Sequence, residues 1–294
     1  MKKLNPPLST VNRKLKTAKS PQGLLFLVGI GPGDHRDMTA RAIAVLRNCD
    51  IVVGYSRYIE LVQPFIEGKP VIASGMTREI ERCSRAIAAA CRGKKVALIS
   101  SGDAGVYGMA GLALQLLAKK KLRRQIAVEV VPGVPVVNAA AARFGAPLMN
   151  DYAVLSLSDL LTPWEVIAKR LTHAAQSDMV ICLYNPKSTK RNRQIKEAQS
   201  LLLTCRGKNT PVGIARNLGR KGELVRLTTL GRMLRCRIDM LTVIIIGNSS
   251  TTSPPSAAKA SKRRFGASPG PLTTGQQDHG TTGLQIRRKT GSNY

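Results

Sequence analysis

Aromatic residues and histidines are scarce in this chain of 294 residues. Phe, Trp and Tyr together make up 4% of it, and only three histidines are present. The shortage of aromatic rings argues against a surface on which nucleic-acid bases stack. Six cysteines occur, but none forms a C-x-x-C pair or clusters with a histidine. We therefore expect no metal site and no disulfide framework, and reduced thiols of this kind fit a cytoplasmic protein.

Long apolar runs are also missing. No stretch approaches the roughly 18 apolar residues that a membrane-spanning helix needs. The first residues, MKKLNPPLST, lack the apolar centre of a signal peptide. The sequence therefore predicts no membrane span and a cytoplasmic location.

Acidic residues are few, so the charge of the chain is strongly positive. Asp and Glu number 17 against 46 Lys and Arg, which gives a net charge of +29. Residues 1–23 and 251–294 are basic and lack periodic apolar residues, so we expect both to be disordered extensions. The basic excess continues between them. It favours a nucleic acid, an anionic membrane or a polyanionic small molecule as partner, or it forms a solvated surface.

Two glycine-rich loops each follow an apolar run. VGIGPGD (28–34) follows LLFLV, and SGDAGVYG (101–108) follows VALIS. Ligands bind beyond the carboxyl ends of strands in open α/β sheets, so the loops predict a small-molecule site. The first loop has the spacing G-x-G-x-G and contains Pro32, which lacks a backbone donor. No acidic residue ends the run IVVGYSRY (51–58). These features argue against a dinucleotide site.

Strands and helices are expected to alternate between the two extensions. The pattern predicts a helix capped by Asp37 and ending at Asn48, and another capped by Thr77 and ending at Cys91. Five apolar segments follow residue 150, the last two close together, which indicates antiparallel strands in a mixed sheet. We expect an α/β fold of two domains, residues 24–148 with a mainly parallel sheet and residues 149–250 with a mixed sheet, and an active site in the cleft between them.

Five motifs in order carry a resemblance to a known family. GIGPGD, SGDAGVYGMAG, VVPGV, LYNP and PVGIARN resemble those of the tetrapyrrole methylases, over about residues 24–248. The resemblance implies S-adenosylmethionine as cofactor and a homodimer. SGMTRE, LSDLLTPWEVI and LYNPKSTKR are similar to the branch that methylates precorrin-3B at carbon 17 and contracts the ring to precorrin-4, in cobalamin biosynthesis. Alternatives are another corrinoid methyltransferase of the same fold, including one for cobalt-factor III, or a basic nucleic-acid-binding protein.

The resemblance also implies which positions hold the cofactor. Three departures stand out: Ala104 replaces a frequent proline, Pro135 replaces a hydroxyl residue, and Tyr55 stands where sirohaem-type relatives have an aspartate base. The implied cofactor-binding residues are Pro32, Ser101, Gly102, Asp103, Val106, Pro135, Val136, Tyr184, Asn185, Asn217 and Leu218.

The implied substrate is a tetrapyrrole with many carboxylates. Arg57, Arg78 and Arg216 are candidates to bind these carboxylates, because a guanidinium can hold a carboxylate with two hydrogen bonds. Each could equally be a surface residue. Asp34 is the candidate acid or base for the proton transfers of ring contraction, with a turn cap as its alternative role.

Overall fold

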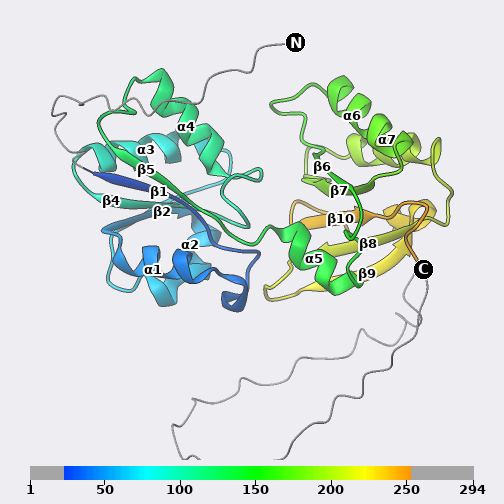
Figure 1. Cartoon of the computed structure of the whole chain (residues 1–294), viewed down its shortest axis with the longest axis horizontal. Helices are drawn as coiled ribbons and strands as arrows, with labels where there is room; N and C mark the ends of the chain where they lie inside the picture. Colours follow the sequence, from blue (N-terminus) through cyan, green and yellow to red (C-terminus); the bar gives the residue numbers. More distant parts are fainter. Residues whose placement is uncertain (1–22, 253–294) are drawn as a thin grey trace, which may run out of the picture. The chain divides into compact units, whose positions relative to one another are not determined.

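The computed structural model describes residues 23–252, and these contain two five-stranded sheets within one compact unit (Figure 1). The extensions expected at 1–23 and 251–294 lie almost wholly outside the described residues. Within 23–252, no helix combines the length and the apolar character that crossing a membrane requires.

The first sheet is parallel throughout, in the order β3-β2-β4-β1-β5. Its strands read as continuous apolar runs because helices bury both faces. Helices α3 and α4 pack on one face, and α1 and α2 pack on the other. The strands are β1 (Leu24–Gly29), β2 (Ile51–Tyr55), β3 (Val71–Ser74), β4 (Lys95–Ser100) and β5 (Ala127–Val131), and the helices are α1 (Ala40–Asn48), α2 (Ser56–Val62), α3 (Glu79–Cys91) and α4 (Met109–Lys119).

The second sheet is mixed, in the order β6-β7-β10-β8-β9. Strands β6 and β7 are parallel, and the other pairs are antiparallel, so the sheet is mixed as expected. The last two strands, β9 and β10, do not pair with each other as their closeness in the sequence suggested, because β8 lies between them and runs antiparallel to both. Its elements are β6 (Tyr152–Ser156), α6 (Trp164–Gln176), β7 (Val180–Tyr184), α7 (Arg193–Leu203), β8 (Pro211–Arg216), β9 (Leu224–Thr229), the 3-10 helix η3 (Leu230–Arg235) and β10 (Thr242–Ile246).

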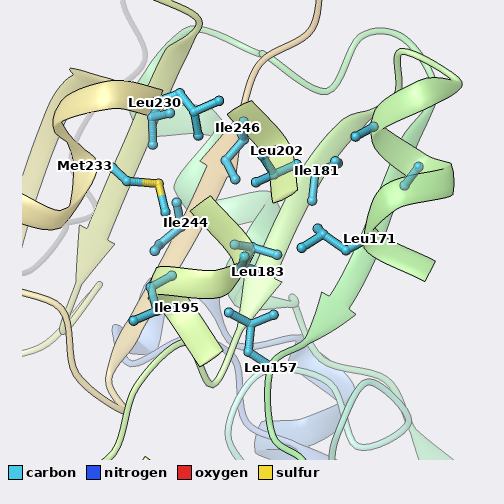
Figure 2. Packing of buried hydrophobic residues seen from close by; sticks show 14 of the residues in the cluster. Leu157, Leu171, Ile181, Leu183, Ile195, Leu202, Leu230, Met233, Ile244 and Ile246 are labelled. Carbon is cyan, nitrogen blue, oxygen red and sulfur yellow. The ribbon is translucent and has the colours of Figure 1, made fainter. Parts of the chain in front are cut away.

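One face of the second sheet carries a dense aliphatic core. Figure 2 shows Leu183 and Ile244 from the strands among Leu171 of α6, Leu202 of α7 and Met233 of η3. Helix α5 (Val136–Phe144) packs on the opposite face. It therefore covers the second sheet although it follows directly from the first. The division at 148/149 falls between the two sheets, and it stays a prediction about domains.

Two helix starts differ from the sequence-based expectation. Thr39 caps α1, since its hydroxyl accepts a hydrogen bond from the Ala42 amide at 3.1 Å. Asp37 does not cap it, because it lies inside a 3-10 turn, η1 (His35–Asp37). Thr77 does not cap α3 either: its φ is 64°, and its hydroxyl donates to the Met76 carbonyl. A further short 3-10 helix, η2 (Gln63–Phe65), follows α2.

Candidate functional site

Three glycines meet where strands β1, β4 and β5 end. A Cβ atom on Gly29 would lie 2.7 Å from both the Gly102 carbonyl oxygen and the Gly133 amide nitrogen. Gly31 and Gly102 exchange backbone hydrogen bonds of 3.1 and 2.7 Å, and both have positive φ. Only residues without a side chain allow this approach. The glycines of the motifs GIGPGD, SGDAGVYGMAG and VVPGV therefore allow the three loops after these strands to contact one another.

Asp103 fixes these loops through both of its carboxylate oxygens. Oδ1 accepts from the Gly105 amide at 2.7 Å, and Oδ2 accepts from the Gly133 amide at 2.9 Å. A carboxylate in such a loop can accept hydrogen bonds either from the ammonium group of a ligand or from neighbouring backbone amides. The structure shows the backbone contacts.

The second sheet faces these loops with Tyr184 and two asparagines. The Tyr184 hydroxyl accepts from the Val137 amide at 3.2 Å, and burial raises the pKa of Tyr184 to about 12. Asn185 and Asn217 have φ of 48° and 52°, a left-handed conformation that often marks functional sites. Asn185 is held by Ser156, whose hydroxyl oxygen accepts from its amide at 3.0 Å.

Together these segments line a hollow that we call the glycine-loop cavity. All eleven positions that the resemblance implied for the cofactor line it. The structure thus brings residues between Pro32 and Leu218 to one place. Sequence reasoning missed the remaining lining residues, which are Tyr58, Tyr107, Arg220, Met240, Leu241, Thr242 and Val243.

A second hollow, the basic cavity, shares several lining residues with the first, including Tyr58, Ser101 and Arg220. Its volume is about 690 Å³, against about 150 Å³ for the glycine-loop cavity, so it suits the larger of two ligands. Cationic side chains outnumber acidic ones in its lining. The cations are Arg57, Arg82, Lys187, Arg216 and Arg220, and the acids are Glu79 and Asp239.

The three arginines suggested for the substrate have different surroundings. Arg57 is exposed and lines the basic cavity. Arg216 lines it too, but its Nε donates to Asp239 at 2.6 Å, so its charge is already paired. Arg78, just before α3, lines neither cavity and pairs instead with Glu81 of that helix, 3.5 Å away. Only Arg57 therefore presents an unpaired charge to the cavity among these three.

Asp34 also lies outside the lining of both cavities. Arg36 donates to its carboxylate from the side chain at 2.6 and 3.0 Å and from the backbone at 2.9 Å. These hydrogen bonds lower the pKa of Asp34 to about 2, which makes it a weak base. The structure shows the alternative role of Asp34 as a turn cap, because Asp34 is the N-cap of η1.

Arg220, on the loop between β8 and β9, is the main residue that sequence reasoning missed. Its Nη2 donates to the Ser101 hydroxyl at 2.6 Å, and its Nε donates to the Pro32 carbonyl at 3.0 Å. Its guanidinium lies 5.6 Å from the centre of the Tyr58 ring. Burial lowers the pKa of Arg220, but arginine stays charged in proteins. Arg220 thus stands where the two cavities adjoin.

Within residues 23–252 no group of three or more His, Cys, Asp or Glu side chains is placed to hold a metal ion. The residues that line the two cavities offer hydrogen-bonding, apolar and cationic surface.

Comparisons with known proteins identify the family to which the chain belongs. Residues 24–234 match the family model of the tetrapyrrole (corrin/porphyrin) methylases. A Salmonella typhimurium protein described as a probable cobalt-factor III C(17)-methyltransferase is 50% identical over 225 residues, which are 76% of this chain and 92% of that protein. The cobalt-factor III methyltransferase of Priestia megaterium is 47% identical over 229 residues. These are 77% of this chain but only 42% of that protein, so the chain spans less than half of its length.

The crystal structure of the methyltransferase CobJ superposes with a TM-score of 0.73 at 30% identity, over 79% of this chain and 97% of that one. Family model, relatives and fold agree over most of the described residues. The chain is a methyltransferase and belongs to the tetrapyrrole methylase family.

Proposed function

We propose that this chain transfers a methyl group from S-adenosylmethionine to carbon 17 of a corrinoid tetrapyrrole, with ring contraction, in cobalamin biosynthesis. One observation carries the proposal: the eleven cofactor positions implied by the motifs line one cavity, and that cavity adjoins a larger, basic one. Two adjoining hollows of different size and charge suit a transfer between two bound molecules.

The glycine-loop cavity fits the cofactor chemically. S-adenosylmethionine combines a flat adenine, a polar ribose and an amino-acid end. Pro135, Val136 and Leu218 offer apolar surface for the ring, while Asn185 and Asn217 offer amides for polar groups. Gly102 keeps the loop close to the cavity because a bare backbone leaves room for a ligand. When bound, the cofactor supplies an electrophilic methyl group.

The basic cavity fits a polycarboxylate. Its five cationic side chains and two acids produce a positive field, which attracts a substrate with several carboxylates and orients it before contact. Arg57 is exposed and can bind a carboxylate at the cavity mouth. Arg78 is not part of this proposed set, because it lines neither cavity and pairs with Glu81.

The residues of this chain act by positioning. Methyl transfer is an in-line displacement, and alignment of the two reactants can contribute about 7–11 kcal/mol to lowering the barrier. Arg220 holds the loop between β8 and β9 against Ser101 and Pro32, so it fixes the walls on both sides of the junction. The ring of Tyr58 lies next to the Arg220 guanidinium. Burial raises the pKa of the Tyr58 phenol, so its hydroxyl stays neutral and can donate a hydrogen bond where the two cavities adjoin.

Two tetrapyrroles are candidate substrates, metal-free precorrin-3B and cobalt-factor III. The names of the two relatives above favour the cobalt-bearing substrate. The cobalt would arrive as part of the substrate. We further propose a homodimer, as the family resemblance implies.

The test is turnover with each substrate separately. The full chain is incubated with S-adenosylmethionine and either precorrin-3B or cobalt-factor III, and products are followed by mass and absorption. A gain of one methyl group with at least one of them supports the proposal. Binding of the cofactor without methylation of either tetrapyrrole would overturn it.

A further inference from the structure

Arg82 is a buried cation in the wall of the basic cavity. It lies in the first turn of α3 with 4% of its surface exposed, and it lines that cavity. Its Nε donates to the Ser74 hydroxyl at 2.9 Å, and its Nη2 donates to the Gly75 carbonyl at 2.8 Å. Its Nη1 reaches only the sulfur of Met109, at 3.7 Å. A thioether is a weak acceptor, so one end of this guanidinium has no strong partner.

The charge of Arg82 also has no counter-ion among residues 23–252. Eight ion pairs occur there, and none includes Arg82. Glu79 lines the same cavity but makes no ion pair with it. Glu81 pairs with Arg78 and Arg85 instead. A buried charge without an opposite charge destabilises a fold, so its presence at a cavity wall needs a reason.

The contacts of Arg82 hold its guanidinium in the wall of the basic cavity, beside Met109 and Tyr55, which also line it. Ser74 at the end of β3 and the following Gly75 hold two nitrogens, and the guanidinium lies 5.9 Å from the centre of the Tyr55 ring. Arg216 differs, because Asp239 already neutralises it. Arg57 differs because it is exposed. Among the described residues, Arg220 and Lys187 also make no ion pair, but both are only partly buried. Arg82 is therefore the most deeply buried cation in the lining of the basic cavity, and it has no acidic partner within residues 23–252.

We infer that Arg82 is a carboxylate subsite of this cavity, with Nη1 donating to one acidic side chain of the tetrapyrrole. The inference rests on the proposed function. A carboxylate at Nη1 supplies both the missing acceptor and the missing negative charge, and a charge-assisted bond is stronger where water is excluded. One fixed acidic arm sets the rotation of the macrocycle in the cavity. Arg82 thus acts as a substrate-binding and positioning residue.

The test uses the full chain with Arg82→Met and Arg82→Lys, and Arg85→Met as matched control. Methionine keeps the unbranched stem without the charge, and lysine keeps the charge without the fork. Arg85 lies on the same helix, is half exposed and lines neither cavity. Cobalt-factor III is titrated and followed by absorption, S-adenosylmethionine is titrated by calorimetry, and thermal midpoints report folding.

We expect Arg82→Met to raise the Kd for cobalt-factor III at least tenfold and Arg82→Lys to raise it less, with the cofactor Kd within twofold of the parent. Arg85→Met should change neither. A folded Arg82→Met with the parent Kd for cobalt-factor III would overturn the inference. If Arg82→Met does not fold, Arg82→Lys decides: a raised Kd supports the subsite, and a parental Kd overturns it. Cofactor binding without tetrapyrrole binding by the parent would instead overturn the proposed substrate, and this inference with it.

Discussion

Replacing Arg220 tests how the loop between β8 and β9 is held against the first sheet. Arg220→Gln removes the hydrogen bonds to Ser101 and Pro32 and the cation–ring contact with Tyr58. Hydrogen bonds to a charged group contribute about 1.5–3 kcal/mol each, and the cation–ring contact contributes about 0.5–2 kcal/mol. At a cavity wall, water can bind the groups that Arg220 leaves, and this recovers part of the lost free energy. We therefore expect Arg220→Gln to lower the free energy of unfolding by about 2–4 kcal/mol.

A double-mutant cycle isolates one contact within that total. Arg220→Gln, Ser101→Ala and the double variant are unfolded in urea beside the parent. The 2.6 Å bond between the two side chains predicts a coupling free energy of about 1–2 kcal/mol. The same cycle is repeated for S-adenosylmethionine affinity by calorimetry, where the double variant should bind no more weakly than Arg220→Gln. Effects that add within about 0.5 kcal/mol would refute the contact.

Three further predictions concern single side chains. Asp103→Ala leaves two loop amides without their acceptor. A hydrogen bond to a charged group contributes about 1.5–3 kcal/mol, so the affinity for the cofactor should fall at least about tenfold in calorimetry. An unchanged affinity would contradict the role of Asp103 in holding the loops. Arg57→Gln should raise the KM for the tetrapyrrole with the cofactor KM unchanged, whereas Arg216→Gln should also lower stability because it leaves Asp239 unpaired; kinetics and thermal unfolding separate the two. Arg36 lowers the pKa of Asp34 from 3.8 to about 2, so this carboxylate stabilises the fold above pH 3.8 and the stabilisation disappears as the pH falls through about 2. Asp34→Asn should therefore be less stable than the parent at pH 7 and equally stable near pH 2, with an unchanged kcat, and a large drop in kcat would restore a catalytic role.

The glycine loops and the alternation of elements could be read from the sequence for a physical reason. Parallel strands buried on both faces appear as continuous apolar runs, and their carboxyl ends share one edge. Loops such as SGD and VVPG must then lie together, and glycine marks where they touch. This is why the loops 28–34 and 101–108 could be assigned to one site from the residues alone, whereas Pro135 was assigned to it by the family resemblance.

Arg220 and Arg82 could not be found in this way. Arg220 contacts Ser101, which is 119 residues away in the chain, and no local pattern distinguishes it from the many other arginines. Arg82 looks like an ordinary charged residue on a helix until its burial is known. Asp34 is the opposite case: its place in a glycine-rich loop suggested a catalytic carboxylate beside the cleft. The structure shows instead that the neighbouring Arg36 binds this carboxylate. Which charged residues belong to the site depends on their burial and their hydrogen-bond partners, and the fold determines both.

The central claim is that this chain methylates carbon 17 of a corrinoid tetrapyrrole. The most direct measurement uses S-adenosylmethionine labelled with ¹³C in its methyl group, cobalt-factor III or precorrin-3B, and the full chain, with the product examined by NMR. The account predicts the label as a methyl group on carbon 17 of a contracted ring. A label on another carbon, or an unlabelled macrocycle in the presence of bound cofactor, would contradict it.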